Sequence, residues 1–273
     1  MERGVSLYDP ERHASLTYLY SGHDPGVCCR FHSAMARWSE GFPDRAASEI
    51  HEALKLAQKL NHPLTTAATQ WFEAWLQYQR GEREAASQTA ERLIGLADAH
   101  GFKQFTDVAL VVAQAGRAEQ PRAASLDEVR RQLGAINVTA TRKTLSLCML
   151  AELYGKADKP TEGRAVLASV DENSRQALYA PEILRVDAEL ILASGASNVR
   201  EAEQRFLKAI EIARSREHKS FELRSATSLA RLWARQHRSE EAHGLVSGVY
   251  AWFTEGFETA DLRSARELLK ELA

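Results

Sequence analysis

The sequence contains little cysteine, little proline and no long apolar run. Its 3 cysteines form no even-numbered framework, which fits a reducing compartment better than a disulfide-stapled secreted domain. No window approaches the ~18 consecutive apolar residues that a membrane helix needs. Charged residues throughout the first part of the chain also exclude the apolar core of a signal peptide. We therefore expect a cytoplasmic protein with no membrane contact.

An excess of charge of one sign is missing as well. The chain has 35 Lys and Arg against 37 Asp and Glu, a formal net charge of -2. This balance gives no general attraction to nucleic acid or to anionic membranes. Basic residues do gather at Arg214, Arg216, His218 and Lys219, but acidic residues alternate with the basic ones. A phosphate-tracking surface there would be short, so nucleic acid is not an expected partner.

Motifs that bind phosphates or carry out catalysis are also absent from the sequence. Gly155-Lys156 lacks the upstream glycine and the following Ser or Thr of a phosphate-binding loop. Neither a G-x-S-x-G elbow nor an H-E-x-x-H motif occurs. We therefore expect no enzymatic activity within this chain and no cofactor.

The sequence does show the periodicity of amphipathic helices. Only 7 prolines interrupt it, and the alternation typical of strands is nearly absent. Residues 46–57 place Ile50, Ala53 and Ala57 at offsets of three and seven, on one helical face. Residues 201–213 repeat this pattern. The predicted fold class is all-α.

Turn-like segments recur at a spacing near 40 residues. Each ends in a small residue at Ala46, Ala86, Gly163, Ala202 or Ala242. The gap between the second and third of these is double, so it should contain a degenerate copy near Ala123 or Ala124. Small residues also occur roughly twelve positions before each turn, at Ala34, Ala74, Ala151, Ala188 and Ala230. Small residues on both helices let antiparallel helices approach to ~8–10 Å, so we expect a series of helix hairpins.

This turn pattern resembles the tetratricopeptide repeat, with a period longer than its usual ~34 residues. Three blocks also resemble a bacterial family of large predicted ATPases: "SGHDPGVCCRFHSAMARW", "HEALKLAQKLNHP", and residues 220–273. Its members often carry an N-terminal adenylate or guanylate cyclase domain and end in tetratricopeptide repeats. The resemblance implies a sensory and regulatory arm, built as a right-handed α-solenoid of about six hairpins with a C-terminal capping helix.

The predicted organisation has three parts. Residues 1–24 would be the remnant of a preceding repeat, and residues 257–273 a capping helix with a Leu-rich stripe. Between them we place six repeats at 25–61, 62–101, 102–137, 138–174, 175–218 and 219–256. Because the N-terminal part has no capping helix of its own, we expect the chain to be the C-terminal part of a longer protein. The uncapped N-terminal face could also form a homo-oligomer.

The first helix of each repeat would line a concave groove. In the first two repeats the groove positions are unusually aromatic; they include Phe31, His32, Met35, Trp38, Trp71, Phe72, Trp75 and Tyr78. Such a cluster is typical of a hot spot that binds a protein or peptide. It could instead stack an aromatic or sugar ligand in a small-molecule sensor, or simply be the core between helices.

In the later repeats the groove positions are charged. Arginines occupy four of them, at Arg185, Arg224, Arg231 and Arg235. Glu182, Glu189, Glu152 and Lys156 occupy neighbouring positions. Arginines on one stripe could grip a carboxylate or phosphate by paired hydrogen bonds. The alternative is a solvated face on which acidic neighbours already neutralise the arginines.

A possible metal site lies near the start of the first repeat. His23, Cys28, Cys29 and His32 are close in sequence, and Cys28 and His32 are separated by one helical turn. The spacing is not that of a zinc motif, so these two residues are minor candidates only. Asp24 and Pro25 instead predict a helix start, with Asp24 as the N-cap. Cys29 would then point toward the packing.

Overall fold

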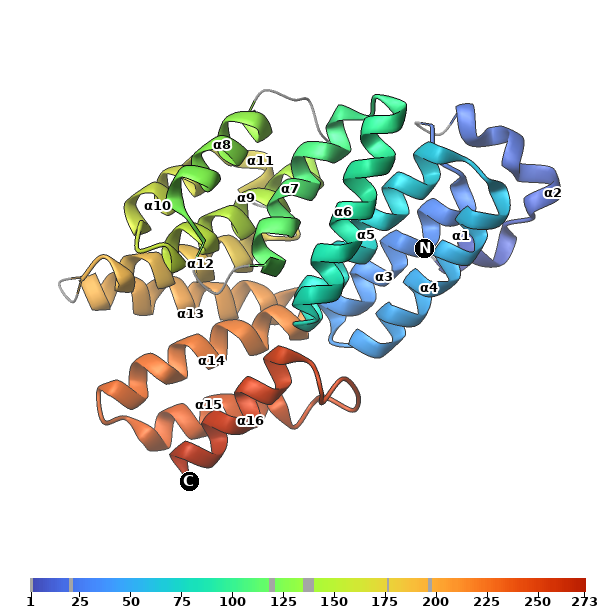
Figure 1. Cartoon of the computed structure of the whole chain (residues 1–273). Helices are drawn as coiled ribbons and strands as arrows, with labels where there is room; N and C mark the ends of the chain where they lie inside the picture. The colour runs from blue at the N-terminus through green and yellow to red at the C-terminus, as the bar shows by residue number, and fades with distance from the viewer. Residues whose placement is uncertain (1, 20–21, 118–120, 135–139, 176, 196–197) are drawn as a thin grey trace. The chain divides into compact units, whose positions relative to one another are not determined.

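The structure is a computed structural model that describes residues 2–19, 22–117, 121–134, 140–175, 177–195 and 198–273 (Figure 1). All regular secondary structure in these ranges is helical, which confirms the predicted all-α class. The chain divides into two compact units, residues 1–117 and 118–273. Each unit is described by itself. None of the described helices has the combination of length and apolar character needed to cross a bilayer.

The first unit is a series of helices that pack in chain order. The α1, α2 and η1 helices are short, and each later helix packs on the one before it, while α3 also contacts α5 and α5 contacts α7. The bounds are α1 Glu2–Leu7, α2 Pro10–His13, η1 Ala14–Tyr18, α3 Pro25–Glu40, α4 Pro43–Leu60, α5 Pro63–Arg80, α6 Arg83–His100 and α7 Lys103–Arg117.

The helix boundaries of this unit follow from local sequence. The α3, α4 and α5 helices begin with proline, whose missing N–H costs nothing in a first turn. Asp24 caps α3 by accepting a hydrogen bond from the Val27 N–H at 2.9 Å, which confirms that prediction. Gly41 ends α3 in the left-handed conformation (φ 96°), which glycine adopts without a steric penalty.

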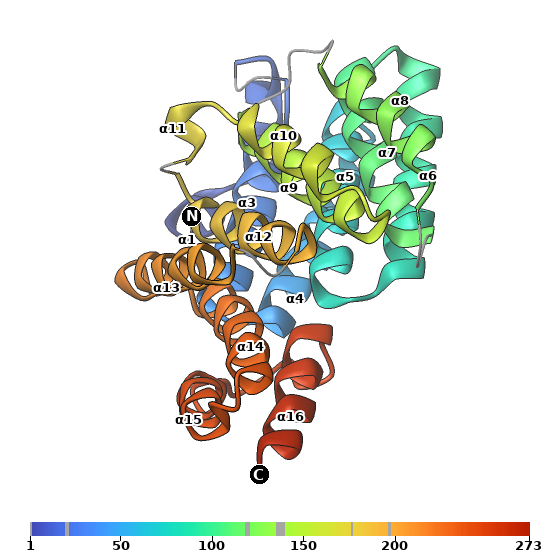
Figure 2. The same cartoon turned by 90° about the vertical axis from the view of Figure 1, so that its left-hand side faces the viewer.

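The second unit repeats the same arrangement of contacts. Consecutive helices pack together from α8 to α10 and from α11 to α16, and α9, α12, α14 and α16 also contact one another in that order (Figure 2). The bounds are α8 Ala123–Gly134, α9 Ala140–Lys156, α10 Pro160–Ala168, α11 Glu172–Arg175, α12 Ala180–Ala193, α13 Val199–Ser215, α14 Lys219–Arg235, α15 Ser239–Tyr250 and α16 Ala260–Leu272. The Leu-rich stripe of α16 buries Leu262, Ala265 and Leu268 against the core of this unit.

The small residues of the recurring turns lie where two helices meet. Every one of the ten that mark the five regular copies is buried. The degenerate copy differs, because Ala123 is half-buried and Ala124 is exposed. In α8 the buried residues are instead Leu126, Val129 and Leu133. The boundary between the two units falls within residues 102–137, and the predicted repeat boundary at 137/138 lies outside the described residues.

Gly163 shows how close the small residues bring two helices. A Cβ atom at this position would lie 2.9 Å from the carbonyl oxygen of Ala151 and 3.0 Å from the side chain of Leu190. Because a backbone atom cannot move away easily, we expect Gly163→Ala to lower the free energy of unfolding of the second unit by about 1–3 kcal/mol. Chemical denaturation followed by circular dichroism measures this change.

Gly244, inside α15 of the same unit, provides the matched control. A Cβ atom there would meet nothing within 4 Å. Since alanine is the better helix former, Gly244→Ala should raise the free energy of unfolding by about 0.5–1 kcal/mol. Equal effects of the two substitutions would contradict close packing at Gly163.

Candidate functional site

The aromatic side chains predicted for the groove of the first unit are buried. Phe31, Met35, Trp38, Phe72 and Tyr78 are at most 8% exposed. The exposed fraction is 0% for Trp71 and 1% for Trp75. Of the alternatives that the sequence leaves open, this burial supports the core rather than an accessible groove. His32 is half-buried.

Ring contacts between α3 and α5 explain this burial. Phe31 stacks on Phe72 with ring centroids 4.2 Å apart. Trp38 meets Trp75 edge to face at 5.3 Å. Short side chains at these positions would face a groove. Large rings instead reach across the gap between the two helices and pack on the neighbouring helix. The aromatic residues therefore join two hairpins.

Cys28 and His32 lie close together on α3. The Cys28 Sγ lies 3.5 Å from His32 Nδ1, which is also 2.9 Å from the carbonyl oxygen of Cys28. Burial, with smaller contributions from Cys29 and Asp24, raises the pKa of Cys28 to about 11, so its thiol stays protonated near neutral pH. Within the described residues no group of three or more His, Cys, Asp and Glu side chains could hold a metal ion.

Cys29 points toward the packing, as predicted. A Cβ atom at Gly4 would lie 2.7 Å from the Cys29 Sγ, so α1 sits directly on this side of α3. Tyr8 adds to this contact by donating a 2.6 Å hydrogen bond to Asp24. The stretch that looked like a ligand set is therefore the seam between α1 and α3.

The charged positions of the second unit form a network of ion pairs. Arg185 on α12 pairs with Glu182 and Glu189, each at 2.8 Å, and with Glu152 on α9. Arg224 on α14 pairs with Glu182 at 3.0 Å and with Asp261 on α16 at 2.7 Å. These contacts join α9, α12, α14 and α16.

Burial and charge act in opposite directions on Glu182. Its carboxylate is desolvated, which by itself raises the pKa, but the adjacent Arg185 and Arg224 outweigh that effect and lower the pKa to about 2. Arg185 and Glu182 are therefore charged at neutral pH and mutually neutralised. Neither is available to a partner. This corresponds to the alternative that the sequence left open, in which acidic neighbours neutralise the arginines.

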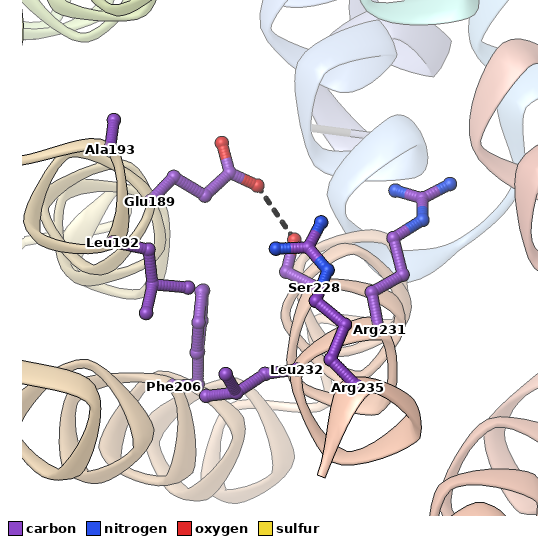
Figure 3. A pocket seen from close by; sticks show the side chains of 8 residues that line it. All are labelled: Glu189, Leu192, Ala193, Phe206, Ser228, Arg231, Leu232 and Arg235. Carbon is purple, nitrogen blue, oxygen red and sulfur yellow. Dashed lines mark hydrogen bonds between the residues drawn. The ribbon is translucent and has the colours of Figure 1, made fainter. Parts of the chain in front are cut away.

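A pocket of about 350 Å³ lies between α12, α13 and α14. Figure 3 shows its apolar side, made of Leu192, Phe206 and Leu232, below the polar side chains. Above them the Ser228 hydroxyl donates a 2.7 Å hydrogen bond to Glu189. Ala193, Arg231 and Arg235 complete the lining.

A second pocket of about 250 Å³ lies farther along α12. It lies between α9 and α12 and shares Glu189 and Ala193 with the first. The rest of its lining is Glu152, Gly155, Lys156, Val186 and Leu190. The two pockets together form a groove across α9, α12 and α14, which we call the α12 groove. The volume of the first pocket alone, about 350 Å³, is at the lower end of the range of about 300–1,000 Å³ found for ligand sites.

Arg231 and Arg235 differ from the two arginines of the ion-pair network. Both are exposed, and among the described residues neither lies within ion-pair distance of a carboxylate. Arg231 donates a hydrogen bond to the Ser264 hydroxyl on α16. The sequence places all four arginines on one stripe, but only the structure separates the two neutralised ones from the two that remain at the pocket.

The basic residues near the start of α14 have partners within the second unit. Arg214 and Lys219 both pair with Glu222, at 2.6 and 2.8 Å. Arg216 donates to the carbonyl oxygen of Ala177 at 2.6 Å. Each of these three basic side chains thus has at least one acceptor in the second unit.

Sequence reasoning missed Ser228 and the apolar residues that line the pocket. Phe206 lies in residues 201–213, whose amphipathic pattern predicts packing, and Leu192 and Leu232 gave no signal of their own. Comparison with protein-family models finds no matching family, and no significantly similar protein is found among the curated proteins. The geometry of the α12 groove is therefore the basis for assigning a function.

Proposed function

We propose that this chain is a non-catalytic helical-repeat scaffold that binds an extended segment of a partner protein in the α12 groove. The observation that carries the proposal is the continuity of the two pockets across three helices, with a shared apolar and polar lining. The lining contains no histidine or cysteine, and its one hydroxyl is already bonded to Glu189. Such a surface is suited to recognition rather than to bond chemistry.

The pattern of helix contacts supports a right-handed solenoid of tetratricopeptide-like hairpins. In each unit a helix packs on its neighbours, and the first helices of successive hairpins also touch. In an array of this kind those first helices line the concave face, which binds partners. The α9, α12 and α14 helices have this position, and they carry the α12 groove.

The resemblance to bacterial ATPases with cyclase domains supports a regulatory role in the cytoplasm. In such a protein the array would detect a partner and relay its binding to the catalytic domains. A sensor that stacks a small aromatic or sugar ligand between the tryptophans has less support, because Trp71 and Trp75 are buried. Self-association through the N-terminal part has one supporting feature, since Leu7 is 64% and Leu19 is 77% exposed.

Peptides selected on the unmodified chain, and then compared with a variant whose α12 groove is filled, test the proposed function. Ala193 is exposed and lines both pockets, so Ala193→Trp should fill them without disturbing the core. We expect the unmodified chain to enrich sequences from a displayed library of random peptides of about twelve residues, which span about 40 Å when extended. Ala193→Trp should weaken binding of the enriched peptides at least about tenfold, as loss of a buried contact does.

Gly248→Trp is the control for added surface area. This glycine is exposed on α15, and a Cβ atom there meets nothing within 4 Å. Gly248→Trp should bind the enriched peptides like the unmodified chain. If no peptide is enriched, or if enriched peptides bind Ala193→Trp unchanged, the proposed function is wrong.

A further inference from the structure

We infer that the pocket between α12 and α14 selects a partner segment that carries an acidic side chain beside an aliphatic one. This inference rests on the proposed function and adds the chemistry of the occupant. It follows from the pairing of an apolar wall with two arginines that have no ion pair in the described part of the chain.

The apolar wall accepts an aliphatic side chain. Leu192, Phe206 and Leu232 come from three different helices and meet on one side of the pocket (Figure 3). A volume of about 350 Å³ has room for a side chain and a short piece of its backbone. Leu192 is half-buried, whereas Phe206 is 0% and Leu232 is 5% exposed, so a branched aliphatic group would replace water mainly against Leu192.

The two arginines define the charge of the occupant. Arg231 and Arg235 are four residues apart on α14, so their like charges lie on the same face one turn from each other. Arg224, earlier on the same stripe, is neutralised by Glu182 and Asp261. A carboxylate from a partner would relieve the remaining repulsion, and guanidinium groups bind carboxylates by two parallel hydrogen bonds.

The acidic residue of the pocket cannot play this role. Glu189 pairs with Arg185 at 2.8 Å and accepts the hydrogen bond from Ser228. Figure 3 shows the Arg231 side chain pointing away from the Glu189 carboxylate. The Glu189 carboxylate therefore already has its partners. A basic or neutral segment would leave the guanidinium groups of Arg231 and Arg235 without a carboxylate.

The test uses the peptides enriched on the unmodified full-length chain from the displayed random library. We expect these sequences to contain Asp or Glu within two positions of Leu, Ile, Val or Met more often than the starting library does. Fluorescence anisotropy of labelled peptides should show binding about tenfold weaker to the double variant R231Q/R235Q, the loss expected for a charge-assisted contact. Unfolding curves of the variant check that it remains folded.

The double variant R122Q/R200Q controls for the lost charge. Arg122 and Arg200 are exposed arginines of the same unit that do not line either pocket. This control should bind the peptides like the unmodified chain. If the enriched peptides depend on Ala193 but show no acidic excess, or bind R231Q/R235Q unchanged, the inference is wrong while the proposed function stands. If no peptide depends on Ala193, both are wrong.

Discussion

Trp75→Ala should lower the free energy of unfolding of the first unit by about 3–5 kcal/mol, the cost of emptying a buried aromatic site. The indole is 1% exposed and packs edge to face on Trp38, so its removal opens a cavity between α3 and α5. Domain stabilities are about 5–15 kcal/mol, and a loss of this size therefore brings the unit near its unfolding threshold. Urea unfolding read by hydrogen exchange of the α3 and α5 peptides measures the effect in that unit.

Two further substitutions test whether burial of the indole causes the loss of stability. Trp75→Phe keeps most of the ring and removes an indole N–H that has no acceptor among the described residues, so it should cost much less than Trp75→Ala. Trp252 lies on the surface, 39% exposed, and Trp252→Ala should cost about 1 kcal/mol or less. Similar losses for Trp75→Ala and Trp252→Ala would show that the α5 aromatics are not core residues.

Local signals made the helices predictable from the sequence. The Asp24-Pro25 start of α3 and the small residues at the turns act through backbone geometry within a few residues. The degenerate copy near Ala123 lacks this signal, because the first buried residue of α8 is Leu126 rather than a small residue. Helix periodicity predicts that a segment is helical, but the position at which the helix packs depends on its side-chain contacts.

The environment of the aromatic and charged side chains depends on partners far away in the chain. Phe31 is buried by Phe72, and Arg224 is neutralised by Asp261 on α16. No pattern within one helix specifies either contact, so a helical stripe of arginines could be recognised but not divided into paired and unpaired members. The same limit applies to Phe206, whose helix position predicts burial but not a place beside a pocket.

Glu182→Gln should lower the free energy of unfolding of the second unit by about 3 kcal/mol at about pH 7, and this loss should shrink in acid. Glu182 accepts from both Arg185 and Arg224, so the neutral amide removes the charge that joins two arginines of different helices. Removing one member of a buried network leaves the others imperfectly paired, which is costly. The matched control is Glu211→Gln, at an exposed pair with Lys208, which should change stability by less than about 0.5 kcal/mol.

The direction of the pH dependence follows from the pKa of Glu182. Its folded value of about 2 lies below the ordinary 4.5, so the stability that it contributes is complete above the ordinary value and is lost as pH falls toward the folded value. By about pH 3 roughly 2 of the ~3 kcal/mol should be gone, from the difference between the two titrations. The stability gap between the unmodified chain and Glu182→Gln should therefore narrow from about pH 5 downward.

Urea unfolding at each pH, read by pulse-labelled hydrogen exchange in α12 and α14, measures the gap. A gap that stays constant between neutral and acidic pH would mean that Arg185 and Arg224 do not hold Glu182 ionised, and no gap at any pH would mean that its ion pairs do not stabilise the second unit.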